Sequence, residues 1–198
     1  DVFVLTLICA VAAGVLAYIF TMTKEPIAQA REKVTLAAVQ TVLPEFEKLA
    51  DAAACKAAIA EADAPEMYAA FQGGKLVGAA IQITDPGGFG GDVTFMIGVT
   101  ADAKVHAIRL LSHKETPGLG TKLAEEKFAS QFKGISIPEG GLKVTKDGGT
   151  IQAITGATIS SRTATRSATR AVELFTKYQQ RLASVATSAA PAQGGPRG

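Results

Sequence analysis

The sequence predicts an α+β protein in which one N-terminal transmembrane helix precedes a single domain with a mostly antiparallel sheet and packed helices. Residues 2–23 are almost wholly apolar and contain no charged side chain. Residues 66–113 read as strands separated by Gly- and Asp-containing turns, which is typical of hairpins. From Thr158 onwards, apolar residues recur every three or four positions, as in an amphipathic helix. The 198 residues are enough for one domain with appendages.

The first segment predicts a membrane span over residues 1–23. At ~1.5 Å per residue, residues 2–23 reach ~33 Å, slightly more than the ~30 Å hydrocarbon layer. A buried core helix would be apolar on one side only, and a signal peptide has a shorter apolar core followed by a small-residue cleavage site. Lys24, Arg31 and Lys33 follow the span, but Glu25 and Glu32 lie between them, and the sequence gives no upstream flank for comparison. The orientation is therefore left open by the charges.

Residues 24–64 are predicted to form a helical connector. Pro26 favours a helix start or a break just after the span. Residues 27–43 have the pattern of a surface helix that ends before Pro44. Residues 51–63 are rich in alanine and fit either a short helix or a loop.

Residues 65–183 are predicted to form the domain. Its expected strands are residues 66–71, 76–83, 93–99 and 105–113, with short strands at 142–144 and 150–155. A helix is expected at residues 121–134, and a long one from Thr158, whose apolar stripe comprises Ala164, Ala168, Ala171, Phe175, Tyr178 and Leu182. Residues 184–198 are rich in Pro, Gly and small side chains, which predicts a disordered C-terminal tail.

Composition and charge exclude several classes of function. The formal net charge is only +2, Trp is absent and no basic stripe is present, so a nucleic-acid partner is not expected. The two cysteines, Cys9 and Cys55, lie far apart in the sequence, which rules out zinc spacing, a CxxC redox pair and an iron–sulfur cluster held by this chain alone. With only two histidines, no metal site is expected. Any electron transfer must therefore depend on an organic cofactor.

Three glycine-bearing segments are candidate binding loops: residues 87–91, 115–120 and 155–161. They match neither the dinucleotide fingerprint nor the P-loop. In "TGAT", a helix starting near Thr158 would offer free N–H groups to a phosphate, and Gly156 would let the backbone approach it. The alternative, favoured by these residues alone, is that Thr155 or Thr158 is simply the N-cap. Lys146 and Arg162 are either phosphate neutralisers or surface charges.

The segment "SHKETPGLG" contains the other candidate side chains. His113 and Glu115 are two residues apart and would share one face of a strand. This spacing permits acid–base chemistry, but no third orienting group is evident, so a surface pair is favoured. The loop could also offer backbone amides and the Thr116 hydroxyl to a planar ligand.

Taken together, these motifs resemble a known family. "HKETPGLG" followed by "TGATISS", behind one span, a "VLP" and the segment "GGFGG", resembles the FMN-binding domain family of the G subunit of the Rnf electron transport complex and its relative, the C subunit of Na⁺-translocating NADH:quinone reductase. The likeness covers most of residues 1–183, and "HKETPGLG" is more similar to the Rnf protein. The family commonly has Ser where this chain has Thr155, which leaves Thr158 in place.

The resemblance implies that FMN is esterified through its phosphate to the Thr158 hydroxyl. In this family a separate flavin transferase makes the bond with FAD as donor. The matching loop residues implied to lie near the flavin are Glu115, Thr116, Leu119 and Gly120. The remainder of the attachment motif is Thr155, Gly156, Ala157, Ser160 and Ser161. No catalytic residue and no metal ligand is implied.

The implied function is an electron relay in a membrane-bound, ion-translocating ferredoxin:NAD⁺ oxidoreductase. The partners would be the other membrane and iron–sulfur subunits of the Rnf complex, the flavin transferase and membrane lipid. The implied location is the bacterial inner (cytoplasmic) membrane, crossed once, with the flavin domain on the periplasmic side. Catalytic activity of the chain alone is not expected.

Three alternatives remain at this point. The chain could be the equivalent C subunit of the quinone reductase, with the same linkage and a different electron acceptor. It could be a membrane-tethered binding module without a redox cofactor, in which Thr158 is only an N-cap. A flavin enzyme with its own substrate is disfavoured because no catalytic constellation is evident.

Overall fold

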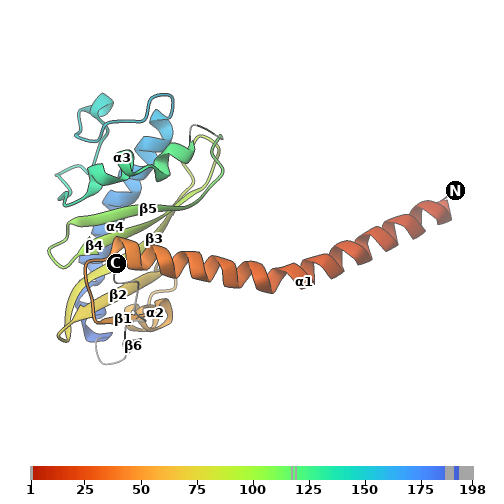
Figure 1. Cartoon of the computed structure of the whole chain (residues 1–198), viewed down its shortest axis with the longest axis horizontal. Coiled ribbons are helices and arrows are strands. Elements are labelled where there is room, and N and C mark those ends of the chain that lie inside the picture. The colour runs from red at the N-terminus through yellow and green to blue at the C-terminus, as the bar shows by residue number, and fades with distance from the viewer. Residues whose placement is uncertain (1, 117, 119, 186–189, 192–198) are drawn as a thin grey trace. The chain divides into compact units, whose positions relative to one another are not determined.

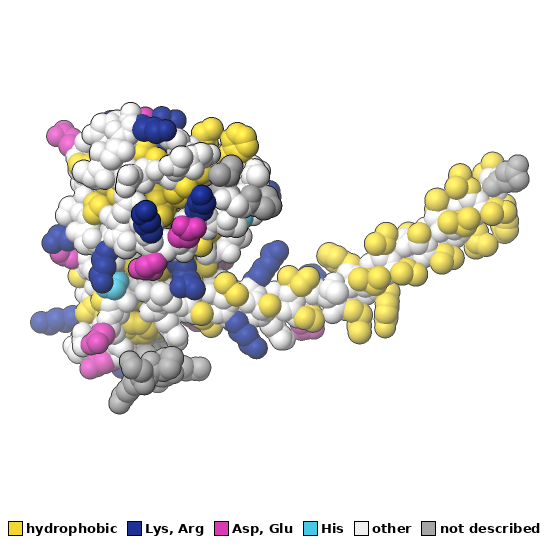
Figure 2. Space-filling model, turned by 45° about the horizontal axis from the view of Figure 1, so that its top comes forward, with side chains coloured by type: hydrophobic (Ala, Val, Ile, Leu, Met, Phe, Trp, Pro, Cys, Tyr) yellow, Lys and Arg dark blue, Asp and Glu magenta, His cyan; other side chains and the backbone are white. Residues whose placement is uncertain are grey.

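The computed structural model describes residues 2–116, 118, 120–185 and 190–191. The chain divides into two compact units, Asp1–Ala37 and Ala38–Gly198. Helix α1, Val2–Val42, supplies the described residues of the first unit. Its apolar side chains are exposed along the N-terminal part (Figure 2). By length and composition, α1 is able to cross a membrane.

Pro26 lies inside α1, so the prediction of a helix start or break at this residue is wrong. Proline lacks the N–H that would bond to the preceding turn, which usually interrupts a helix. The residue whose carbonyl loses its helical donor is Met22, four positions before the proline, and the helix continues through this one missing bond. The helix does end before Pro44, as predicted.

The second unit is built on an antiparallel sheet with the strand order β5-β4-β3-β2-β1-β6 (Figure 1). The strands are β1 Lys48–Ala50, β2 Met67–Gln72, β3 Lys75–Asp85, β4 Val93–Thr100, β5 Val105–His113 and β6 Ala190–Pro191. The hairpin between β2 and β3 turns at Gly73 and Gly74, whose φ angles of 55° and 75° suit glycine. The α+β prediction and its four long strands are confirmed.

Part of the expected connector, residues 24–64, belongs to the sheet unit. Strand β1 was not predicted, because a three-residue strand has no detectable alternation, yet it pairs with β2 along its whole length. The end of α1 also packs on the sheet: Val39 and Val42 are fully buried against one face, with Tyr68, Ala70, Ala80 and Met96. Helix α2, Ala52–Ile59, is capped by Asp51, whose carboxylate accepts the Ala54 N–H at 2.8 Å.

The opposite face of the sheet is covered by α4, Thr158–Ala183. All six residues of its predicted apolar stripe are buried, and Phe175 is completely enclosed. The stripe packs on inward-facing residues of the central strands, among them Phe71, Ile81 and Phe95. This packing fixes α4 on the sheet, so the position of its first turn is set by the core.

Two expected elements differ in the structure. The segment predicted as one helix, 121–134, is split into the 3₁₀ turns η1 Gly120–Ala124 and η2 Ser130–Phe132 around the short helix α3 Glu126–Ala129. Leu123 and Phe128 are both buried, but five residues of α-helix would place them about 140° apart, so one straight helix cannot bury both.

Residues 142–144 and 150–155 do not form strands. They make a single parallel bridge between Val144 and Ile151, beside the 3₁₀ turn η3 Thr145–Asp147. Within the tail expected to be disordered, 184–198, residues 186–189 and 192–198 lie outside the described residues. Residues 190–191 pair with β1 as β6.

Candidate functional site

The three glycine-bearing segments meet at one cavity of about 370 Å³. The loop between β3 and β4 supplies Phe89, and the segment after β5 supplies Glu115 and Thr116. Turn η3 supplies Lys146. The other side is the start of α4, with the lining residues Gly156, Ala157, Thr158, Ile159 and Ser160. Segments far apart in the sequence therefore form one site because the core places α4 beside the ends of β3, β4 and β5.

Thr158 is the first residue of α4, and its hydroxyl does not cap the helix. The N-cap position belongs to Ala157, which makes no side-chain capping bond. The turn is held instead by Ser161, whose hydroxyl donates to the Ala157 carbonyl at 2.9 Å and accepts the Ile154 N–H at 3.0 Å. Gly156, with φ 84°, makes the reversal before the helix. The prediction that Thr155 or Thr158 is the N-cap is therefore wrong.

The start of α4 is suited to an anionic group. The first helical hydrogen bond runs from the Ser161 N–H to the Ala157 carbonyl at 3.0 Å, so the preceding N–H groups have no acceptor in the helix. Together with the helix dipole, they favour negative charge next to Thr158. The half-buried Thr158 side chain lies in the cavity wall at this position.

Lys146 is the cation next to the Thr158 hydroxyl. Its Nζ lies 3.2 Å from Thr158 Oγ1. Arg162, one turn along α4, is engaged elsewhere: its Nε and terminal nitrogen each donate to Asp147 at 2.7 Å. These bonds hold the pKa of the Asp147 carboxyl below its ordinary value and tie η3 to α4. Of the two candidate neutralisers, Lys146 is the one placed beside Thr158, and Arg162 fixes the turn that presents it.

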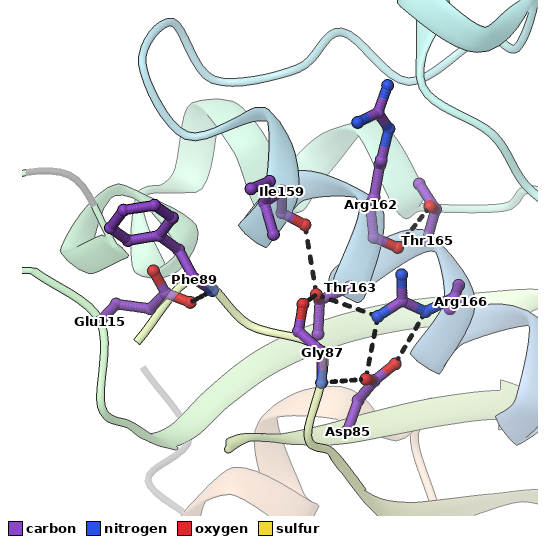
Figure 3. Close-up of polar contacts among 9 residues, drawn as sticks. All are labelled: Asp85, Gly87, Phe89, Glu115, Ile159, Arg162, Thr163, Thr165 and Arg166. Atoms are coloured by element: carbon purple, nitrogen blue, oxygen red, sulfur yellow. Dashed lines mark hydrogen bonds and ion pairs between the residues drawn. The ribbon is translucent and has the colours of Figure 1, made fainter. Parts of the chain in front are cut away.

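Glu115 joins the loop and the helix from within the cavity wall. Its side chain is only 7% exposed. One carboxylate oxygen accepts the Phe89 N–H at 2.7 Å (Figure 3). The other accepts the Ser160 hydroxyl at 2.9 Å. The expected surface pair of Glu115 with His113 is wrong, because the contact between them is the Glu115 N–H donating to His113 Nδ1 at 3.2 Å.

The glycines around Glu115 are required by close packing. A Cβ on Gly88 would overlap the Gly91 carbonyl and the Glu115 carboxylate, and a Cβ on Gly120 would overlap the Glu115 side chain. The loop therefore folds directly onto Glu115 and leaves Phe89 at its tip. Close packing against Glu115 therefore explains why this segment is rich in glycine, although it does not match a nucleotide-binding fingerprint.

Two apolar side chains at the cavity were not predicted as site residues. Phe89 is 70% exposed and Ile159 is 44% exposed. Among the described residues that follow α1, these are the exposed large hydrophobic side chains. The glycines on both sides of Phe89 were the only signal in the sequence, since exposure depends on the fold.

The remaining predicted site residues are distributed around the cavity. Thr116 lines it and is exposed, whereas Gly120 is buried behind Glu115. Thr155 is exposed and lines a neighbouring cavity of about 360 Å³ with Ile154 and Phe128. Leu119 lies outside the described residues. The site residues that meet in one place are thus the Glu115 segment and the turn from Gly156 to Ser160.

A second polar cluster anchors the glycine-rich loop on α4 (Figure 3). Asp85, at the end of β3, receives hydrogen bonds from Arg166 at 2.9 and 3.1 Å and from the Gly87 N–H at 2.8 Å. Burial of the Asp85 carboxyl acts to raise its pKa, but these hydrogen bonds outweigh burial and hold the pKa below its ordinary value. The Thr163 hydroxyl donates to the Gly87 carbonyl at 2.8 Å. The start of the loop is therefore fixed to the helix that begins at Thr158.

Comparisons with known proteins agree with this arrangement. Residues 88–173 match the FMN-binding domain family, a stretch that contains all three glycine-bearing segments apart from Gly87. The G subunit of the ion-translocating oxidoreductase complex of Aliivibrio fischeri is 32% identical, over 90% of this chain and 90% of its own. This chain belongs to the family of these G subunits. The G subunit of Cereibacter sphaeroides is 33% identical, over 87% of this chain and 81% of its own.

A solved structure supports the fold. The crystal structure of Shewanella oneidensis NqrC matches with a TM-score of 0.50 and 20% identity, covering 61% of each chain. At this level of identity the likeness concerns the arrangement of helices and strands. The resemblance drawn from "HKETPGLG" and "TGATISS" is confirmed by the family match.

Proposed function

We propose that this chain is the electron-relay subunit of a membrane-bound, ion-translocating ferredoxin:NAD⁺ oxidoreductase, with FMN held through a phosphoester on Thr158. The observation that carries the proposal is the position of the Thr158 hydroxyl. This hydroxyl does not cap the helix, and it lies at the positive N-terminal end of α4. Its oxygen is 3.2 Å from Lys146 Nζ. Membership of the G-subunit family supports the relay role and assembly with other subunits.

The cavity fits an organic cofactor of this kind. Its polar end offers the N–H groups of the first turn of α4 and the Lys146 ammonium to a phosphate. Phe89 and Ile159 provide exposed apolar walls for a flat ring system. A flavin supplies the redox chemistry when bound, and the protein supplies position and electrostatics.

Each group of this chain has a separate task in the proposed mechanism. Thr158 provides the oxygen through which the cofactor is tethered, so that a carrier serving two partners is not lost by dissociation. Lys146 and the start of α4 stabilise the remaining negative charge of the diester. Glu115 keeps the Phe89 loop against α4, which holds one wall of the cavity in place.

Attachment requires a second protein. The Thr158 hydroxyl contacts the Lys146 ammonium, which is a hydrogen-bond donor and not a base. We therefore assign activation of the hydroxyl to a separate flavin transferase with FAD as donor. α1 would anchor the chain in the inner membrane with the flavin domain on the periplasmic side.

The proposal is tested by mass and fluorescence of the full chain produced with the transferase. The wild-type chain should carry an FMN-sized mass increment and should fluoresce as a denatured band under ultraviolet light. Thr158→Ala should lose both signals. Thr150→Ala is the matched control, because Thr150 is exposed and lies outside both the attachment motif and the cavity, and it should keep both. A wild-type chain with the mass of its amino acids alone would overturn the proposal.

A further inference from the structure

A larger cavity, of about 730 Å³, lies on another part of α4 and is not used by the proposed flavin site. One wall is the end of β3 at Ile83–Pro86, and the other is the loop Gly140–Lys143. Its floor is the face of α4 from Arg166 to Lys177. We call it the α4 groove. The loop is fixed over the helix by Thr169, whose hydroxyl accepts the Leu142 N–H at 2.9 Å and donates to the Thr165 carbonyl at 3.0 Å.

The α4 groove combines an apolar base with a cationic rim. Ile83, Leu142 and Leu174 contribute apolar side chains to its lining. Four cations, Lys143, Arg166, Arg170 and Lys177, face only two carboxylates, Asp85 and Glu173. A recessed surface with an excess of one charge concentrates its field and attracts the opposite charge.

The cations of the groove differ in whether they are already paired. Arg166 is bound by Asp85 at 2.9 Å, and Lys177 is bound by Glu61 at 2.8 Å. The side chains of Arg170 and Lys143 are exposed and make no ion pair or hydrogen bond with the residues that the structure describes. One cation on the floor of the groove, Arg170, and one on its loop wall, Lys143, are therefore available to an incoming anion.

A buried hydroxyl in the lining also lacks a partner. Ser167 is 1% exposed, and its Oγ has no hydrogen-bond partner among the described residues. Buried hydroxyls are nearly always hydrogen-bonded, so an unsatisfied one in the lining of a cavity points to a polar group supplied from outside.

The dimensions favour a chain segment over a small ion. From Arg166 to Lys177 the groove follows about 16 Å of helix, at ~1.5 Å per residue. The cations are spread along this length instead of converging on one point. An extended peptide of about five residues, at ~3.3 Å each, spans the same distance and can present carboxylates at intervals. A single phosphate would reach one or two of the cations and would lie near Asp85 or Glu173.

We propose that the α4 groove binds an acidic, partly apolar segment of another subunit of the same complex. Its carboxylates pair with Arg170 and Lys143, and its apolar side chains cover the base of the groove. This inference rests on the proposed membership of a multisubunit complex. It adds an assembly surface that is separate from the cavity at Thr158, so a partner bound there leaves the flavin site open.

The test is charge reversal in the assembled complex. The double variant Arg170→Glu/Lys143→Glu should reduce co-purification of the other subunits by about tenfold at low salt, and the difference from the wild type should decrease at higher salt because salt screens the charges. The matched control Lys75→Glu/Lys56→Glu changes the net charge equally at exposed lysines outside the groove and should co-purify like the wild type. Both doubles should keep a wild-type flavin content, because neither touches the cavity at Thr158.

A photo-crosslinker in place of Glu173 identifies the occupant. It should attach to a segment rich in Asp and Glu of another subunit, and the attachment should disappear in the double variant. Retention of the partners by Arg170→Glu/Lys143→Glu, or crosslinks to lipid alone, would overturn the inference while leaving the flavin proposal intact. A wild-type chain that carries flavin but co-purifies with no other subunit would overturn both the inference and the complex membership.

Discussion

At the scale of single residues, the chemistry of the site is concentrated on one hydroxyl and one ammonium. Thr158 is held at the start of α4 by a turn that other side chains stabilise, so its hydroxyl remains available. Lys146 reaches it because the bonds between Asp147 and Arg162 fix η3 on α4. A carboxylate in place of Lys146 would repel a phosphate bound to Thr158, whereas the Lys146 ammonium attracts it.

Lys146→Met should therefore slow flavin attachment without abolishing it. Lys146 is exposed, and exposed charge pairs contribute about 0.2–1 kcal/mol, so we expect a rate about two- to fivefold lower. The measurement is the time course of the mass increment with the transferase in excess. Lys143→Met is the matched control, since Lys143 lies in the preceding loop and lines the α4 groove instead. Equal rates for the two variants would exclude a role for Lys146.

At the scale of elements, the glycine-rich loop and α4 are joined by buried or half-buried carboxylates. Asp85 ties the start of the loop to Arg166 (Figure 3). Glu115 ties the tip of the loop to Ser160. Neither element could form the cavity alone. The Phe89 side chain at the tip of the loop is exposed, so the position of the loop depends on these polar contacts and on glycines that allow close approach.

Glu115→Ala should release the Phe89 loop. The Phe89 N–H and the Ser160 hydroxyl would lose their acceptor inside the structure, which should lower the free energy of unfolding by about 1–3 kcal/mol. The mass increment should persist, because Thr158 is unchanged, while the visible circular dichroism and the fluorescence anisotropy of the attached flavin should fall.

Ser160→Ala serves as the comparison for Glu115→Ala. It removes one of the two hydrogen bonds and leaves the carboxylate bound to the Phe89 N–H, so its effects should be smaller. Flavin spectra of Glu115→Ala that are identical to the wild type would show that the loop does not hold the ring.

At the scale of the whole domain, a charged network joins the segment after α2 to the end of α4. The Glu61 carboxylate accepts hydrogen bonds from Lys177 at 2.8 Å and from the Tyr178 hydroxyl at 2.6 Å, and Arg181 lies 3.1 Å away. The hydrogen bonds from Lys177 and Tyr178 lower the pKa of Glu61 from 4.5 to about 2. The network holds the C-terminal end of α4, far along the helix from Thr158.

This network predicts a defined dependence of stability on pH. Because the pKa of Glu61 is lower in the folded chain, its stabilising effect is complete above pH 4.5 and is lost as the pH falls towards about 2. Glu61→Gln should remove this stabilising effect. The difference in the free energy of unfolding between wild type and variant should therefore decrease as the pH falls from 4.5 to about 2. The measurement is the unfolding midpoint of the full chain in detergent across this range. Parallel curves for the two proteins would contradict the prediction.

The sequence by itself determined the periodic elements and the motifs. The apolar run in α1, the four long strands and the buried stripe of α4 could be predicted because burial on one face repeats with the period of the backbone. The segments "HKETPGLG" and "TGATISS" indicated the family before any contact was known, because their residue types and order are specific. They also gave Thr158 as the attachment residue, which stays a prediction until tested.

Only the tertiary structure decided which of these residues meet. It brought Phe89, Lys146 and Ile159 to Thr158, made Ala157 the N-cap and turned Glu115 into a buried link between a loop and a helix. It also added β1 to the sheet and split the helix expected at 121–134. The physical reason is the same in each case: these features depend on contacts between residues distant in the chain, which local periodicity and propensity do not encode.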